Sequence, residues 1–249
     1  MLRVVSYVAL CAALGASGYA HAGKEHPGKP TVTVQMQVDD AANDADRATV
    51  MEGWAMIRAG KIQAAIDGPF NQVVNKYEAK YGNQAGKTVF CARTMEDGLL
   101  YSSSALVADS KSSVTVLGPA WAMAYGGRAY AYNEMNRPDD ARVELEKAIA
   151  LSPRETEYKS ELAYVYQIKR DFESSLRLYN EALADAEIIA SDPVKSKCIA
   201  YRGSGYALVE LGRLDEAVKA YEGCLKIKPG EPKSTGELGY IRDLRAKAK

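Results

Sequence analysis

Internal repetition, in which similar residues recur at regular separations along the chain, constrains the fold more than any other feature of the sequence. One offset places Tyr130 on Tyr164, and a slightly longer one places Tyr164 on Tyr206. Repeats of this length are single supersecondary units that bury their apolar faces only by stacking on their neighbours. We therefore expect a row of stacked helical units. A small residue precedes each tyrosine: Ala129, Ala163 and Gly205.

The third unit is the most regular, and it resembles a tetratricopeptide repeat, a 34-residue helix-turn-helix. It has the small residue Gly205 in its first helix, Gly212 at the turn, Asp215-Glu216-Ala217 opening the second helix, and a closing Pro229. The resemblance implies an all-α helix-turn-helix solenoid with three repeats over residues 118–230. It also implies a capping helix over 231–249, and leaves a minor irregular, β-like region at the N-terminal end.

Residues 1–22 are predicted to be a secretory signal. Arg3 precedes an apolar run from Val4 to Leu14, and Ala20-His21-Ala22 places small residues at the two positions that signal peptidase reads. Cleavage before Gly23 gives a periplasmic or secreted chain with no later membrane-spanning segment. Residues 23–45 are then expected to be an extended N-terminal segment.

Residues 46–117 are expected to form an irregular helical region that includes a degenerate repeat. Gly68-Pro69 is predicted to break that repeat, with Pro69 starting a fresh helix. Thr94 to Asp97 forms a capping box that predicts a helix, and Ser152-Pro153-Arg154-Glu155 forms another, with Ser152 as N-cap. Short β-like runs are predicted at residues 30–38, 88–90 and 113–116.

Composition excludes several classes of function. The only histidines are His21 and His26, so the folded body has no Ser-His-Asp triad, Cys-His pair or histidine-bound metal. The 32 basic and 32 acidic side chains balance, which argues against nucleic acid as a partner. No motif for a cofactor or metal is present, so neither is expected.

Three cysteines remain after signal cleavage: Cys91, Cys198 and Cys224. Cys198 and Cys224 lie at nearly equal sequence distances on either side of Gly212, so an antiparallel hairpin brings them to about the same height. Two interpretations stay open: a disulfide joins them, or both are buried thiols. In either case Cys91 is expected to react, unless it bridges two chains.

The resemblance also implies a site, because the first helices of tetratricopeptide units line a concave groove that receives peptides or partner helices. Tyrosines suit protein recognition, and the alternative is that they only fill space between repeats. The Lys/Asn set that clamps a peptide's terminal carboxylate in some family members is missing. The implied groove residues are Tyr130, Asn133, Glu134, Ser160, Tyr164, Gln167, Arg202, Tyr206 and Glu210.

The sequence therefore predicts an exported, non-catalytic adaptor or scaffold that binds a protein or peptide partner. One alternative is an envelope enzyme, a hydrolase or transferase, with a carboxylate- or Cys91-based site in residues 61–117. Another is a purely architectural role in an envelope complex, in which the convex face or the solenoid end does the binding.

Overall fold

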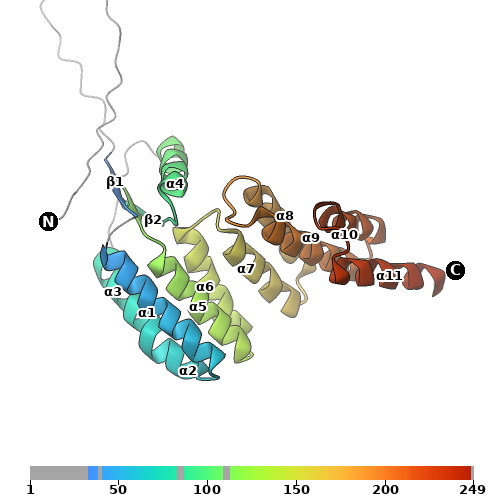
Figure 1. Ribbon diagram of the computed structural model, residues 1–249, viewed down its shortest axis with the longest axis horizontal. Coiled ribbons are helices and arrows are strands. Elements are labelled where there is room, and N and C mark those ends of the chain that lie inside the picture. Colours follow the sequence, from blue (N-terminus) through green and yellow to red (C-terminus); the bar gives the residue numbers. More distant parts are fainter. Residues whose placement is uncertain (1–32, 39–40, 83–86, 109–112, 248–249) are drawn as a thin grey trace, which may run out of the picture.

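The computed structural model describes residues 33–38, 41–82, 87–108 and 113–247 (Figure 1). The predicted signal peptide lies outside these ranges, as do residues 23–32 of the segment predicted to be extended. Antiparallel helices stack side by side along most of the described chain, and a small sheet with one helix lies against the ends of several of them. The predicted all-α solenoid is confirmed.

A complete helical hairpin comes first, and it is longer than the predicted degenerate repeat. It consists of α1 (Ala41–Arg58), α2 (Ile62–Ala65), η1 (Ile66–Phe70) and α3 (Asn71–Tyr81). Helix α1 begins inside the segment predicted to be extended. The buried Asp46 accepts hydrogen bonds from Lys76 Nζ and Tyr77 Oη at 2.7 and 2.9 Å, which ties α1 to α3.

The predicted break at Gly68-Pro69 is wrong. The chain turns earlier, at Gly60, whose φ of 75° is the left-handed conformation that glycine adopts without strain. Residues 62–81 then run as one continuous helical segment, and Pro69 lies inside its π-helical turn η1. A π-turn uses i→i+5 bonds and widens the helix locally, so the proline, which has no N–H, is accommodated there.

An α/β insertion separates this hairpin from the next one. It contains β2 (Lys87–Cys91), α4 (Met95–Ala108) and β3 (Ser113–Leu117), and β3 also pairs with β1 (Val34–Gln37). All pairings are parallel, in the order β1-β3-β2. Thr94 Oγ1 accepts from Asp97 N at 3.1 Å, so the predicted cap of α4 is confirmed. Residues 87–117 are therefore a β-α-β unit within the region predicted to be irregular and helical.

Three helical hairpins follow, where the three repeats were predicted. Each turns at a residue with positive φ: Asn136, Arg170 and Gly212, at 57°, 61° and 73°. The six helices are α5 (Ala120–Glu134), α6 (Pro138–Leu151), α7 (Thr156–Ile168), α8 (Phe172–Ala186), α9 (Pro193–Glu210) and α10 (Leu214–Ile227).

The predicted N-cap at Ser152 is wrong. Helix α7 starts at Thr156, and the side chain of Glu155 caps it by accepting from Glu157 N. Ser152 Oγ instead donates to the carbonyl of Cys91 at 2.7 Å, in the buried contact between the end of α6 and strand β2. The serine thus joins the insertion to the repeats.

Close approach of a small residue to a large side chain sets the register within the hairpins. A Cβ placed on Gly205 would come within 2.6 Å of the ring of Tyr221, and one on Gly53 within 2.5 Å of the ring of Phe70. The second pair is one position further apart in sequence than the first, because the π-turn adds one residue. The first hairpin is thus a fourth unit of the same kind.

The last helix, α11 (Pro232–Lys247), covers the end of the stack. Ile241 is buried against a cluster that includes Tyr221, and Leu238 packs beside it. Within the described ranges, no helix combines the length and apolar character needed to cross a membrane.

The contact between Gly205 and Tyr221 leads to a prediction about stability. Changing Gly205→Ala forces the buried Tyr221 ring to move, so the free energy of unfolding should fall by about 1–3 kcal/mol. The matched control is Gly236→Ala on α11, where a Cβ meets nothing within 4 Å and should stabilise the helix by about 0.5–1 kcal/mol. Thermal unfolding followed by circular dichroism measures both, and equal Tm values for the two variants would contradict the packing argument.

Candidate functional site

Tyr130, Tyr164 and Tyr206 occupy equivalent positions on the first helices α5, α7 and α9, and all three reach solvent. Their exposed fractions are 37%, 50% and 44%, whereas Tyr179 and Tyr221 on the second helices are buried. The exposed tyrosines still make contacts at one edge: Tyr206 packs edge-on against Phe172 at a ring distance of 6.2 Å. All three are therefore partly exposed, unlike the interior Tyr179 and Tyr221.

The aromatic row extends beyond the predicted tyrosines at both ends. The offset that relates Tyr130 to Tyr164 also carries Gly205-Tyr206 onto Gly239-Tyr240 of α11, and Tyr240 is 52% exposed. At the other end Gly53-Trp54 of α1 holds the same place, and the Trp54 ring lies 5.2 Å from that of Tyr130. We call these five side chains the aromatic row: Trp54, Tyr130, Tyr164, Tyr206 and Tyr240. The offset to Tyr240 was readable in the sequence, whereas the α/β insertion and the one-residue-longer first hairpin hid the match to Trp54.

The polar residues predicted for the groove divide into accessible and buried ones. Glu134 is exposed beside Tyr130, and burial together with the charges of Glu134 and Glu161 raises the pKa of Tyr130. Ser160 is buried, and Gln167 Nε2 donates to the carbonyl of Gly203 at 3.0 Å, joining α7 to α9. Gln167 thus joins two neighbouring first helices, whereas Ser160 is withdrawn from the surface.

Asn133 lies one residue before Glu134. Its buried Oδ1 accepts no hydrogen bond from any residue in the described part of the chain.

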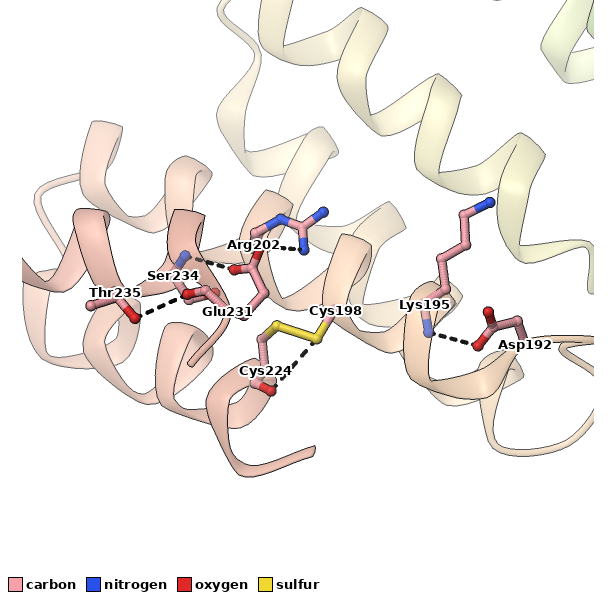
Figure 2. Close-up of a disulfide and its surroundings, with 8 residues drawn as sticks. All are labelled: Asp192, Lys195, Cys198, Arg202, Cys224, Glu231, Ser234 and Thr235. Atoms are coloured by element: carbon pink, nitrogen blue, oxygen red, sulfur yellow. Dashed lines mark hydrogen bonds and ion pairs between the residues drawn. A yellow bond between two sulfur atoms is a disulfide. The ribbon is translucent and has the colours of Figure 1, made fainter. Parts of the chain in front are cut away.

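Two predicted groove residues are ion-paired within the chain. Arg202 Nη1 lies 3.4 Å from Glu231 Oε1, and Glu231 also accepts from Ser234 N at 2.7 Å, at the start of α11 (Figure 2). Although burial opposes ionisation, Ser234 and the Arg202 guanidinium hold the pKa of Glu231 below its usual value. Glu210 lies 3.7 Å from Arg170. Arg202 thus serves the attachment of α11.

Cys198 on α9 and Cys224 on α10 are joined by a disulfide, with their Cα atoms 4.7 Å apart (Figure 2). Cys224 is fully buried and Cys198 nearly so. The bond fastens the hairpin that carries Tyr206, so the position of this tyrosine on α9 is fixed relative to α10.

Cys91 is the free thiol, and it is 1% exposed. It borders a cavity of about 290 Å³ whose wall also includes Arg93, Tyr101, Glu155 and Tyr158. Burial raises the pKa of the Cys91 thiol to about 12, and Arg93 is occupied by Glu155 at 3.0 Å. The thiol therefore lacks the cationic neighbour that activates a nucleophilic cysteine, and the expectation of a reactive Cys91 is wrong.

Side chains able to bind a metal are dispersed. Across the described ranges no three or more His, Cys, Asp or Glu residues gather as a metal site would require.

Comparisons with known proteins agree with the repeat positions. A model of the tetratricopeptide repeat matches residues 122–155 and 200–231, which correspond to the first and third predicted repeats. A search of curated proteins found no match.

The search of solved structures found several that are similar to this chain. The crystal structure of MamA is 17% identical, with a TM-score of 0.51 over 78% of this chain and 84% of that one. A double mutant of MamA RS-1 is 13% identical, with a TM-score of 0.52 over 82% and 86%. The first TPR of Spaghetti (RPAP3), bound to an HSP90 peptide, is 25% identical, with a TM-score of 0.45 over 50% and 93%.

The cysteines allow a chemical test. With a pKa of about 12, only about one Cys91 thiol in ten thousand is ionised at pH 8, and it is also buried. Native protein lacking residues 1–22 should take up no iodoacetamide label, unfolded protein one label, and unfolded reduced protein three. Mass spectrometry counts the labels. Three labels before reduction would rule out the Cys198–Cys224 bond, and rapid native labelling would rule out the buried Cys91.

Proposed function

Because this chain is a tetratricopeptide-repeat protein, we propose that it is a non-catalytic adaptor that binds an extended segment or helix of a partner protein. The partner lies along the first helices α1, α5, α7, α9 and α11. The observation that carries the proposal is the aromatic row, one large side chain per first helix.

The chemistry of the row suits recognition of protein surfaces. A tyrosine offers flat apolar area with a hydroxyl at its tip, and it loses little conformational entropy on binding. Three to five such side chains in a line, each partly exposed, form the apolar patch that usually marks an interaction site. Singly scattered surface aromatics would carry no such meaning.

The row is also held rigidly. Four of its members follow buried small residues, Gly53, Ala129, Ala163 and Gly205, and Gln167 and the disulfide brace α7, α9 and α10. A preformed surface avoids much of the entropy cost of ordering side chains on binding. Rigidity therefore favours a binding role for this face.

A partner tail that ends in a carboxylate is a poor fit. The first helices lack the Lys/Asn set of carboxylate-clamping relatives, and Arg202 is paired with Glu231. An internal segment of the partner is the better match.

We also propose that the protein is exported to the periplasm or secreted. The apolar run and the small residues before Gly23 support this, and a disulfide suits an oxidising compartment.

Export predicts where the mature chain begins. Protein isolated from the exporting compartment should start at or near Gly23, since signal peptidase cleaves after small residues such as Ala22. N-terminal sequencing reads this directly. A chain that still starts at Met1 would overturn the export proposal and leave the binding proposal untouched.

The binding proposal predicts that Tyr164→Ala with Tyr206→Ala weakens partner capture at least about 10-fold, as expected when two central aromatic contacts are lost. Cross-linking pull-down from native envelope extract, quantified by mass spectrometry, measures it. The far-UV helical signal should persist, because both side chains are half exposed.

Val143→Ala, which truncates an exposed apolar side chain on the second helix α6, is the matched control and should leave capture unchanged. Two outcomes would count against the proposal: equal loss with Val143→Ala, or no loss in a folded double variant.

A further inference from the structure

A small hollow adjoins the aromatic row between the N-terminal parts of α7 and α9. It has a volume of about 110 Å³, and Glu157 and Glu161 of α7 face Lys195 and Ile199 of α9 across it. We call it the acidic hollow. Tyr164 stands one helical turn after Glu161 on the same helix, so the hollow and the row are adjacent.

The two glutamates form a like-charge pair. They lie four residues apart on α7, a spacing at which equal charges repel across one helical turn. In the described ranges neither forms an ion pair, and burial together with the charge of Glu157 raises the pKa of Glu161. Such a repulsive pair costs some stability, and a cation supplied by a partner would relieve the repulsion.

Most neighbouring basic side chains already form ion pairs with other acidic residues of the chain. Arg128 pairs with Glu144 at 3.1 Å, Lys159 with Asp185 at 2.6 Å and Arg202 with Glu231 at 3.4 Å. Each of these pairs joins a first helix to another element of the stack. The cations thus serve the fold, while carboxylates are left on the binding face.

Two further cations border the acidic hollow. Arg93 lies 3.0 Å from Glu155 and 3.5 Å from Asp97, and its Nη2 donates to the carbonyl of Ile189. Lys195 lines the hollow, and its backbone N–H donates to Asp192 (Figure 2). One lysine faces two glutamates and Asp192, so the hollow keeps an acidic excess.

A further carboxylate lies toward α5, where Glu134 is exposed beside Tyr130. Tyr130 itself lies near both Glu134 and Glu161, and its ring is 5.2 Å from that of Trp54. Electron-rich rings and carboxylates side by side are what a cationic side chain binds most favourably.

We propose that the acidic hollow and the tyrosines next to it recognise lysine or arginine side chains of the partner segment. This deepens the proposed function and rests on it. The partner is then a basic, internal segment: its apolar parts lie on the aromatic row, and its cations reach Glu134, Glu157 and Glu161.

A selection experiment tests this without knowing the partner. A phage-displayed library of random dodecapeptides is panned on the purified protein, and clones that also bind the Tyr164→Ala, Tyr206→Ala variant are discarded. The peptides that remain should be enriched in Lys and Arg over the starting library. Their affinities are measured by fluorescence polarisation of synthetic, labelled copies.

The variant Glu157→Gln with Glu161→Gln should weaken these peptides at least about 10-fold, as expected for losing charge-assisted hydrogen bonds. The matched control, Glu173→Gln with Glu222→Gln, removes the same charge from exposed positions on α8 and α10. It should change affinity less than about 2-fold, because remote surface charges are screened by salt.

The outcomes separate the two proposals. Tyrosine-dependent peptides that are acidic or uncharged, or that bind both glutamine variants equally, would overturn the basic-partner inference and keep the binding face. If no selected peptide depends on the tyrosines, the proposed function fails as well.

Discussion

The contact between a small residue on each first helix and a bulky side chain on its partner helix determines the rest of this architecture. Gly205 against Tyr221 and Gly53 against Phe70 let the paired helices approach closely. Because the small residue faces the partner helix, the residue that follows it on the same helix points to a different side. In each hairpin it is therefore the position after the small residue that presents an aromatic ring, and four of the five members of the aromatic row follow from the way the core is packed.

Where the same number of residues separates the small residue from the bulky side chain that it contacts, the sequence alone identifies the helical hairpins. The same interval separates Ala129 from Leu145, Ala163 from Tyr179 and Gly205 from Tyr221, so each of the two offsets between units aligns both helices of a hairpin at once. The first hairpin has one residue more, in the π-turn that holds Pro69. This insertion leaves the packing intact but puts Phe70 out of step with the other units. Gly68-Pro69 indicated a break because proline ordinarily interrupts a helix or starts a new one.

Some features of the candidate site could be predicted from the sequence, and others could not. The exposed tyrosines follow from the repeat, and the pairing of Cys198 with Cys224 follows from their similar distances to the turn at Gly212. Ion pairs carry no such signal: nothing local links Arg202 to Glu231, which lies beyond the whole of α10. The same is true of Ser152, whose bond to Cys91 depends on an insertion folded separately from the repeats.

The disulfide has a consequence for how the stack comes apart. In a solenoid each unit contacts only its neighbours, so opening starts as fraying at a free end and spreads inward. At the C-terminal end α11 is held by Ile241 and by the Arg202–Glu231 pair, and it can detach first. The next element inward, α10, is covalently tied to α9. Unfolding that begins at α11 therefore stops at the cross-linked hairpin of α9 and α10. The inner repeats stay folded while α11 detaches and rebinds.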